Sequence, residues 1–261
     1  MMRSRDLLLA LVIVFIWGVN FAIIKLGLRQ VSPLALGVAR FVLAAFPWIF
    51  LVKRPDVPLR QIALYGVLIF AMQFGFLFTG MKLGMSAGLS SLVLQLQVFF
   101  TIGLSVFLLG ERPALWQLAG AALAFGGVGV VALNIGGDVT AIGLVLLIAA
   151  AASWGAGNVV SKQISQRATT ANVLGLVVWG SLFALPPLLA VTLMLEGRQL
   201  LDSFTGLDWV SVASIGYIVY LSTLFCFAAW SGLLARYPVS TVAPFTLLVP
   251  VFGFLGSAVL L

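Results

Sequence analysis

Long apolar stretches separated by short polar breaks run through this chain from end to end. Nine of them are close to the roughly 20 residues that an apolar α-helix needs to cross a bilayer. The expected helices span residues 6–28, 33–53, 59–81, 86–109, 113–134, 140–163, 170–195, 207–234 and 238–261. No segment alternates polar and apolar residues over the ~10 positions of a membrane barrel strand. The pattern therefore predicts an all-α integral membrane protein.

Composition supports the same class of protein. Hydrophobic residues make up 62% of the 261 positions, and charged residues make up 8%. A water-soluble domain of this size could not bury that much apolar surface around one core. The breaks between the helices are short, and only the segment from Glu196 to Trp209 has room for a small surface element. The formal net charge of +7 therefore indicates orientation in a bilayer and not a nucleic-acid partner.

The distribution of basic residues between the loops predicts a cytoplasmic N-terminus. In that orientation nine basic residues lie on the inner side: Arg3, Arg5, Lys53, Arg54, Arg60, Arg112, Lys162, Arg167 and Arg236. Four lie on the outer side: Lys25, Arg29, Lys82 and Arg198. Cytoplasmic loops of membrane proteins are enriched in Lys and Arg, so this bias fixes the expected orientation. Arg40 falls inside the second span, where it either snorkels outward or lines a cavity.

An internal repeat relates the two halves of the sequence. A Trp-Gly pair followed by an asparagine and a lysine occurs twice, with tryptophan and lysine equally spaced: Trp17, Gly18, Asn20, Lys25 and Trp154, Gly155, Asn158, Lys162. Further matches hold a register of 152 residues: Tyr65, Gly80, Ser105 and Leu109 with Tyr217, Gly232, Ser257 and Leu261. A first repeat of five helices would place the second copy upside down. Inverted repeats build a binding site near the membrane midplane and expose it alternately to each side.

The repeat register sets the expected domain limits. Residues 1–135 would form the first five-helix repeat, and residues 136–261 would form the inverted second repeat. Leu261 matches Leu109, after which the first repeat continues into its fifth helix. We therefore expect a ten-helix fold whose tenth helix is missing from this chain, and a sequence that is truncated at its C-terminus.

The stretch from Gly88 to Arg112 carries polar side chains through the fourth expected helix. On a helix that turns 100° per residue, four of them fall within about 80° of one another: Ser90, Gln97, Thr101 and Ser105. Gln95 points away from this stripe. Polar groups inside a bilayer are costly unless they face a pathway or bond to a neighbouring helix. Both explanations remain open for each of these residues.

Several of these patterns together resemble a known transporter family. The initial Trp-Gly-Val-Asn-Phe-x-x-x-Lys, the turn Gly110-Glu111-Arg112 and the paired five-helix repeats are similar to EamA-type transporters of the drug/metabolite transporter superfamily. Within that family the runs IKLGL, AGLSSLVLQLQVFFTI and LLVPV are most similar to bacterial exporters of O-acetylserine and cysteine. The resemblance implies export of small amino-acid metabolites across the bacterial inner membrane by alternating access.

A solute of this kind would need neutral hydrogen-bonding groups, aromatic walls and a cation for its carboxylate. The candidate substrate-binding residues are Trp17, Asn20, Gln73, Gln97, Thr101, Trp154, Asn158 and Tyr220. Interfacial anchoring or helix packing is the alternative for each of them. The candidates for gating or for a position at a helix end are Lys25, Lys162 and Arg40. The expected partners are an amino-acid-like small molecule and the lipid bilayer.

Other function classes find little support in the sequence. The chain has no histidine and a single cysteine, and its seven acidic residues fall at the ends of expected spans or in loops, so we expect no enzyme active site, no metal site and no cofactor. The same distribution predicts facilitated export or exchange without an intramembrane carboxylate proton relay. Two alternatives remain: the same fold carrying drugs or other metabolites, and a membrane protein with a purely structural role.

Overall fold

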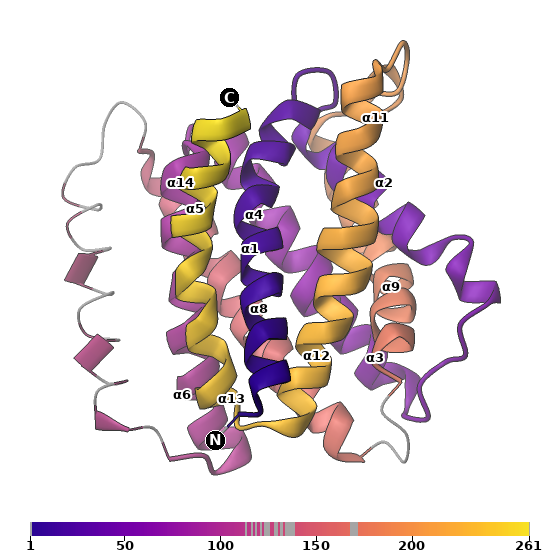
Figure 1. Cartoon of the computed structure of the whole chain (residues 1–261). Coiled ribbons are helices and arrows are strands. Elements are labelled where there is room, and N and C mark those ends of the chain that lie inside the picture. Colours follow the sequence, from indigo (N-terminus) through magenta and orange to yellow (C-terminus); the bar gives the residue numbers. More distant parts are fainter. Residues whose placement is uncertain are drawn as a thin grey trace.

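The computed structural model describes residues 2–112, 114, 115, 117, 119, 120, 122, 126, 127, 130, 133, 139–167 and 172–260. Within these residues, eight helical segments are long and apolar enough to cross a membrane, and they form a bundle (Figure 1). They correspond to eight of the nine expected spans. The fifth expected span, 113–134, falls largely outside the described residues. The observed bounds differ by a few residues from the expected ones, as for Leu59–Lys82 against 59–81.

In the described part of the first half the α-helices are α1 (Ser4–Gly27), α2 (Pro33–Ala45), α3 (Leu59–Gly66), α4 (Gln73–Lys82), α5 (Ala87–Val93) and α6 (Gln97–Leu109). A short 3-10 turn, Trp48–Phe50, follows α2. A π-helical segment, Val67–Met72, joins α3 to α4 within one span. The 3-10 segment Leu94–Leu96 joins α5 to α6 in the same way.

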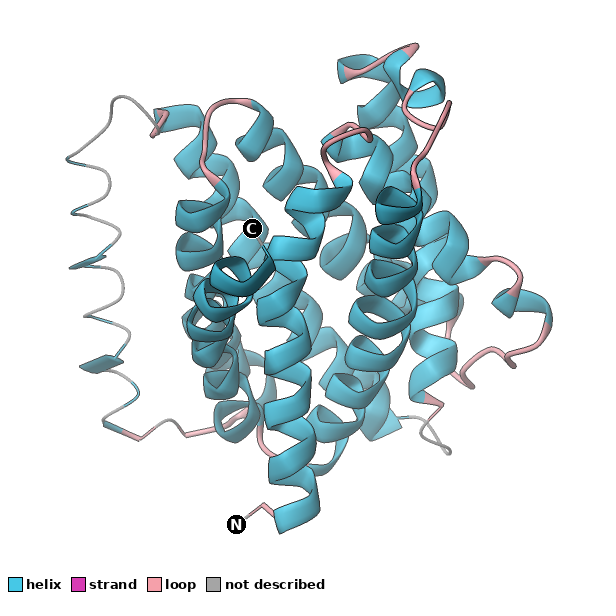
Figure 2. Ribbon diagram, turned by 45° about the horizontal axis from the view of Figure 1, so that its top comes forward, coloured by secondary structure: helices cyan, strands magenta, loops and turns pink. Residues whose placement is uncertain are grey.

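The described helices of the second half are α8 (Ala141–Arg167), α9 (Val173–Leu195), α10 (Gln199–Asp202), α11 (Trp209–Gly216), α12 (Cys226–Arg236), α13 (Val239–Val242) and α14 (Val249–Leu260). The π-helical segment Tyr217–Phe225 joins α11 to α12. The 3-10 segment Ala243–Leu248 joins α13 to α14. The small helix α10 lies in the segment where the sequence left room for a surface element. The bundle is helical with short connections (Figure 2).

Ordinary capping chemistry explains where the helices begin and end. Pro33 occupies the first turn of α2, where its missing N–H costs nothing. The Asn172 side chain accepts a hydrogen bond from the Gly175 N–H and so caps α9. Gly110 ends α6 with a φ of 68°, a conformation that favours glycine.

The helices α1 and α8, which carry the two Trp-Gly motifs, run in opposite directions. α1 begins beside the end of α12, because the Asp6 carboxylate accepts a hydrogen bond from Arg236 Nη1 at 2.6 Å. α8 ends there as well, since Lys162 donates to the Tyr237 carbonyl at 2.9 Å. We call this end of the bundle the base and the opposite end the top; the base is at the bottom of Figure 1. The opposed directions of α1 and α8 are consistent with an inverted repeat.

The glycine of each Trp-Gly motif lies where a helix of one half of the chain packs against a helix of the other half. α1 packs against α14, and α8 packs against α6. A Cβ on Gly18 would come within 2.4 Å of the Phe252 Cβ on α14. On Gly155 it would come within 2.8 Å of the Phe100 Cβ on α6. The glycine of each motif therefore allows close helix packing, as small residues do in membrane proteins.

Irregular segments recur at matching places in the two halves. The residues 152 positions after Val67–Met72 lie inside the second π-helical segment, Tyr217–Phe225. Those 152 positions after Leu94–Leu96 lie inside the 3-10 segment Ala243–Leu248. This is the same register that aligned the two halves of the sequence. The coincidence supports an internal repeat through structure as well as through residue identity.

The outer surface of the bundle is apolar, as a bilayer requires. Large exposed hydrophobic side chains include Leu8, Phe15, Phe107, Val145, Met194 and Val259. The polar side chains of the spans point inward instead: Gln73, Gln97, Thr101 and Asn158 are each at most 1% exposed. The interior of the bundle is therefore where polar chemistry gathers.

Candidate functional site

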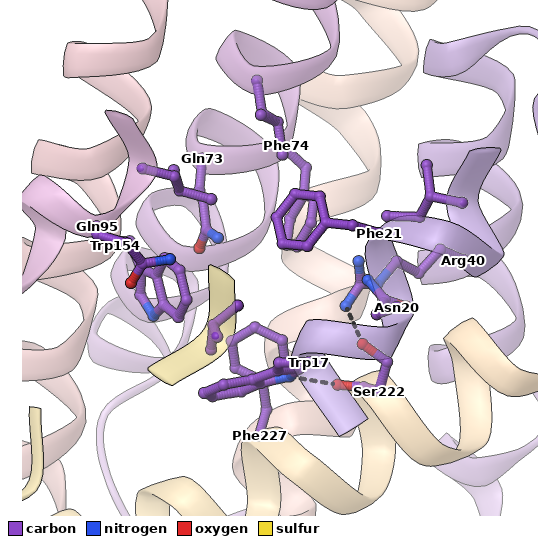
Figure 3. A pocket seen from close by; sticks show the side chains of 14 residues that line it. Trp17, Asn20, Phe21, Arg40, Gln73, Phe74, Gln95, Trp154, Ser222 and Phe227 are labelled. Carbon is purple, nitrogen blue, oxygen red and sulfur yellow. Dashed lines mark hydrogen bonds between the residues drawn. The ribbon is translucent and has the colours of Figure 1, made fainter. Parts of the chain in front are cut away.

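A cavity of about 40 Å3 lies inside the bundle, between helices from both halves of the chain (Figure 3). α1 contributes Trp17, Asn20, Phe21 and Ile24, a spacing that places all four on one face of the helix. The rest of the lining comes from Arg40, Gln73, Phe74, Leu77, Leu94, Gln95, Trp154, Ser222, Phe227 and Val249. We refer to it as the central cavity.

Figure 3 shows how the labelled side chains surround it. Arg40 and Asn20 lie on one side, Trp154 and Gln95 on the other, and Gln73 and Phe74 lie across from Trp17 and Phe227. Four of the predicted substrate-binding residues are therefore brought together here: Trp17, Asn20, Gln73 and Trp154. Arg40, which the sequence placed either in a cavity or at the membrane surface, lines the same cavity.

An aromatic cluster centred on Trp17 lies next to the cavity, towards the base. The Trp17 ring meets Trp154 at 5.5 Å, Phe227 at 5.1 Å and Trp230 at 5.3 Å between centroids. Trp17 and Trp154, the two repeat-related tryptophans, meet edge to face. Such contacts add about 0.5–1.5 kcal/mol each beyond the area that the rings bury. The Trp17 N–H donates to the Ser222 carbonyl at 3.1 Å, which fixes the ring.

Arg40 is a buried cation, and none of the described acidic side chains forms an ion pair with it. Its Nε donates to Thr223 Oγ1 at 2.6 Å, and its Nη2 lies 3.5 Å from Ser222 Oγ. The guanidinium carbon lies 4.1 Å from the centre of the Phe74 ring. The side chain is only 2% exposed, and burial of an unpaired charge costs several kcal/mol. Neutral hydroxyls and a ring face offset only part of that cost.

Five buried polar atoms around the central cavity lack a hydrogen-bond partner in the described part of the protein. They are Asn20 Oδ1, Arg40 Nη1, Gln73 Oε1, Gln95 Oε1 and Trp154 Nε1. Each such group costs about 1–3 kcal/mol when it is buried unpaired. Native proteins satisfy nearly all buried polar groups, so a group of unpaired ones around one cavity indicates a place for a polar solute or water.

A second space adjoins the central cavity at Phe21. A vestibule of about 210 Å3 at the top is lined by Phe21, Lys25, Gly88, Ser91, Pro250, Gly253, Phe254 and Ser257. The central cavity itself has room for about three water molecules. Phe21 lines both spaces. A solute of amino-acid size therefore needs the cavity to widen.

Polar contacts close the base. Asp6 accepts from both Arg236 and Tyr237, each at 2.6 Å. Glu111 accepts from the first backbone N–H groups of α13, at 2.9 Å from Val239 and 3.1 Å from Ser240. Lys162 donates to the Ala235 and Tyr237 carbonyls at the end of α12, as expected of a lysine at a helix end. Helices from both halves are thus tied together at the base.

Three further candidates lie outside the lining of the central cavity. Asn158 donates to Gln97 Oε1 and to Thr101 Oγ1, both at 3.2 Å. Gln97 donates to Thr246 at 2.6 Å, and Trp230 donates to Asn158 at 3.1 Å. We call these five residues the interhelical network. In this conformation they join α6, α8 and α12 to the 3-10 segment before α14, and their role in a pathway remains a prediction.

Tyr220 and Lys25 also lie apart from the central cavity. Tyr220 is half exposed on the outer surface, where its ring packs against Trp48 with 6.2 Å between centroids. Lys25 is exposed at the top and lines the vestibule. Its repeat counterpart Lys162 is buried at the base and bonded to carbonyls. The two lysines therefore stand in different environments at opposite ends of the bundle.

Sequence reasoning missed several residues of the cavity. Gln95, which points away from the polar stripe and was not among the candidates, lines the central cavity, whereas Gln97 and Thr101 of the stripe do not. Gln95 lies in the 3-10 segment Leu94–Leu96, where residues turn by about 120° and not by 100°. Ser222, which lies in the second π-helical segment, was missed as well. A signal was present in the span Val239–Leu260, the repeat counterpart of the span that contains Gln95. Its prolines Pro244 and Pro250 indicate a departure from a regular helix.

Comparison with known proteins gives relatives over the whole chain. A "Probable amino-acid metabolite efflux pump" of Salmonella typhimurium is 45% identical over 264 residues, covering 100% of this chain and 88% of that protein. A protein of the same name from Escherichia coli strain K12 is 44% identical with the same coverage. A "Probable terminal-alkyne amino-acid exporter" of Streptantibioticus cattleyicolor is 28% identical, covering 90% of this chain and 78% of that protein.

A solved crystal structure superposes with a TM-score of 0.72 and covers 99% of this chain and 88% of that chain. At 19% identity this likeness shows the fold alone. A profile of the EamA-like transporter family matches residues 5–133 and matches again over 141–261, which is consistent with the internal repeat. This multi-pass membrane protein therefore belongs to the EamA-like transporter family, a family of transporters and not of enzymes.

Proposed function

We propose that this protein exports small amino-acid metabolites from the bacterial cytoplasm across the inner membrane, and that Arg40 binds the carboxylate of the solute. The observation that carries the proposal is the buried guanidinium of Arg40, whose Nη1 has no partner in the described protein and which lines the central cavity. A carboxylate is the group that best matches a buried guanidinium in charge and geometry. Bound there, it would offset the cost of burying the cation.

The other unpaired groups suit the rest of such a solute. Amide oxygens of Asn20, Gln73 and Gln95 can accept from an amino group, and Trp17 and Phe74 offer ring faces. The printed names of the efflux pumps from Salmonella typhimurium and Escherichia coli also speak of amino-acid metabolites. Cysteine and O-acetylserine are solutes of the right size and polarity, and they are the cargo that we propose.

Alternating access is supported by the contrast between the two ends. The base is tied by hydrogen-bonded side chains below an aromatic cluster, whereas the top has a vestibule that shares Phe21 with the central cavity. In our proposal residues 1–135 and 136–261 are the inverted repeats that rock against each other. Lys162 would release the end of α12 when the base opens. Lys25 would be its counterpart at the top.

The orientation of the chain is part of the proposal, with the base in the cytoplasm. The excess of basic residues on that side supports it. Cysteine placed at Arg54 should react with an impermeant thiol reagent only from the cytoplasmic side, and cysteine at Lys82 only from outside. The native Cys226 is buried, so its background labelling is expected to be low. Labelling of both positions from the same side would contradict the assignment.

The test of function is counterflow in proteoliposomes containing the purified protein. We expect exchange of radiolabelled cysteine or O-acetylserine, and loss of this exchange in Arg40→Met. The matched control is Arg29→Met, because Arg29 is exposed outside the central cavity and should transport like the wild type. Transport by Arg40→Met at the wild-type rate would refute the role of Arg40. Exchange of drugs with none of amino-acid metabolites would favour the alternative cargo.

Energy coupling follows from the charges around the cavity. None of the described Asp or Glu side chains lines the central cavity, so we propose export or exchange down the gradient of the solute. Counterflow with and without an imposed pH gradient tests this. Concentrative transport that requires the proton gradient and disappears with an ionophore would contradict it.

A further inference from the structure

We infer that the central cavity requires a carboxylate on its solute but not an ammonium group, so that N-acylated amino acids, which are monoanions, are substrates alongside zwitterionic ones. This inference rests on the proposed function and narrows it to a chemical class. It comes from the imbalance of charge and of hydrogen-bond donors around the central cavity.

The charges around the cavity are unequal. Arg40 supplies one positive charge, and no described acidic side chain lines the cavity to balance it or to pair with an ammonium. Asp6, Glu111 and Glu196 instead bind groups at the two ends of the bundle. A bound monoanion would neutralise the cavity completely. A zwitterion would pair its carboxylate with Arg40 and leave its ammonium facing neutral groups.

The neutral groups around the cavity serve an acyl amide as well as an ammonium. A side-chain amide carries an acceptor oxygen and a donor nitrogen, and turning it over exchanges the two. Asn20 and Gln73 can therefore accept from N–H groups or donate to a carbonyl oxygen. Gln95 presents its oxygen as an acceptor, because its Nε2 donates to the Ser91 carbonyl at 3.1 Å. None of the three demands a positive charge on its partner.

Trp154 adds a preference for an acceptor. Its indole N–H is a donor only, it is buried, and it has no partner among the described residues. An ammonium group cannot accept a hydrogen bond, so it leaves this N–H unpaired. The carbonyl oxygen of an acyl group can accept it. The donor on Trp154 and the amides thus match the acylated solute at least as well as the free amine.

The same arrangement disfavours amines that lack a carboxylate. An amino-acid methyl ester would place a second positive charge beside the buried guanidinium of Arg40, where little solvent screens the repulsion. Removal of the carboxylate therefore has two effects. It takes away the partner of Arg40, and it leaves an uncompensated cation in the cavity.

The experiment compares three forms of one amino acid: the free amino acid, its N-acetyl derivative and its methyl ester. Each is tested as a competitor of counterflow in proteoliposomes and, separately, for thermal stabilisation of the purified protein, since a bound ligand stabilises the folded state. We expect the N-acetyl compound to compete within about tenfold of the free amino acid, and the ester at least about tenfold more weakly than either. Trp154→Phe should weaken the N-acetyl compound more than the free amino acid.

The outcomes separate this inference from the proposed function. An ester that binds as well as the acid, or an N-acetyl compound that neither competes nor stabilises while the free amino acid does, would overturn the inference alone. Absence of counterflow with every amino acid would overturn the proposed function. In that case the thermal-shift series still decides whether the carboxylate controls binding. Equal weakening of both acids in Trp154→Phe would remove the assigned role of Trp154.

Discussion

Two groups of polar side chains lie inside the spans, and they differ in how well their hydrogen bonds are satisfied. In the interhelical network, Asn158 contacts Gln97, Thr101 and Trp230, and Gln97 reaches Thr246. Around the central cavity, five buried atoms of similar chemistry have no partner in the described protein. Both groups consist of amides, an indole and hydroxyls or a guanidinium. Their composition does not distinguish the two groups, but the number of their polar atoms that have a hydrogen-bond partner does.

The contrast separates a structural role from a binding role. A satisfied polar network in a membrane holds helices together, and truncation of one member leaves its partners unpaired. An unsatisfied group has no protein partner to lose, so its removal should cost no stability. The chain offers matched pairs of residues, one from each group. The same substitution in the two members of a pair should therefore give opposite results.

The asparagine pair should show the largest difference. Asn158→Leu removes three hydrogen bonds within the interhelical network and should lower the free energy of unfolding by about 2–3 kcal/mol. Asn20→Leu should leave stability unchanged or raise it, and should lower the transport rate. Thermal unfolding in detergent and counterflow measure the two effects. Equal loss of stability in both variants would abolish the distinction.

The glutamine pair should behave in the same way with a smaller effect. Gln97→Leu breaks the contact with Thr246 and those with Asn158 and Thr101, at a cost of about 1–2 kcal/mol. Gln73→Leu should fold like the wild type, because its Oε1 has no partner to strand. Its transport rate should fall. Wild-type transport by Gln73→Leu would place the binding site elsewhere.

The tryptophan pair sharpens the comparison further. Trp230→Phe keeps a ring near Trp17 but loses the N–H that donates to Asn158, so we expect a loss of about 0.6–1 kcal/mol. Trp154→Phe removes an N–H without a partner and should leave the unfolding midpoint unchanged. A stability loss in Trp154→Phe as large as that in Trp230→Phe would mean that its N–H is satisfied in the membrane.

A polar group in water gives the smallest expected effect. The backbone N–H and the hydroxyl of Ser211 lower the pKa of Asp208 below its ordinary value of 3.8, because both interact with the carboxylate that caps α11. A lowered pKa in the folded state means that this contribution is present above pH 4 or so and is lost as the pH falls through the lowered value. Asp208→Asn should remove this acid dependence from the unfolding midpoint. The shift should be slight, since Asp208 is fully exposed.

The spans could be predicted because the bilayer imposes one length on all of them. Apolar runs and breaks at proline, glycine and charged residues located Leu59–Lys82 and Val173–Leu195 to within three residues. The repeat also predicted that Trp17 and Trp154 are related, and the structure brings the two rings into contact. These features depend on local composition and on spacing, which a sequence carries directly.

The irregular helical segments limited the prediction of the site. Gln95 lies in a 3-10 segment and Ser222 in a π-helical one, and neither residue was among the candidates. Each departure rotates the following side chains relative to a regular helix. The satisfaction of Asn158 and the isolation of Asn20 were also beyond reach, because both depend on which side chains the fold brings opposite them. Whether these polar groups find hydrogen-bond partners depends on tertiary contacts and not on the helix face that carries them.

The π-helical segments Val67–Met72 and Tyr217–Phe225 each provide a place where a span can change its helical register, which couples a rotation to a translation. A π-helical turn takes in one residue more than an α-helical turn, so a one-residue change of register between the two forms turns the remainder of the span by about 100° and advances it by about 1.5 Å. Gln73 directly follows the first segment, and Ser222 and Thr223, which hold Arg40, lie within the second. A register change in either span would therefore reorient cavity-lining groups together with the part of the helix that follows them.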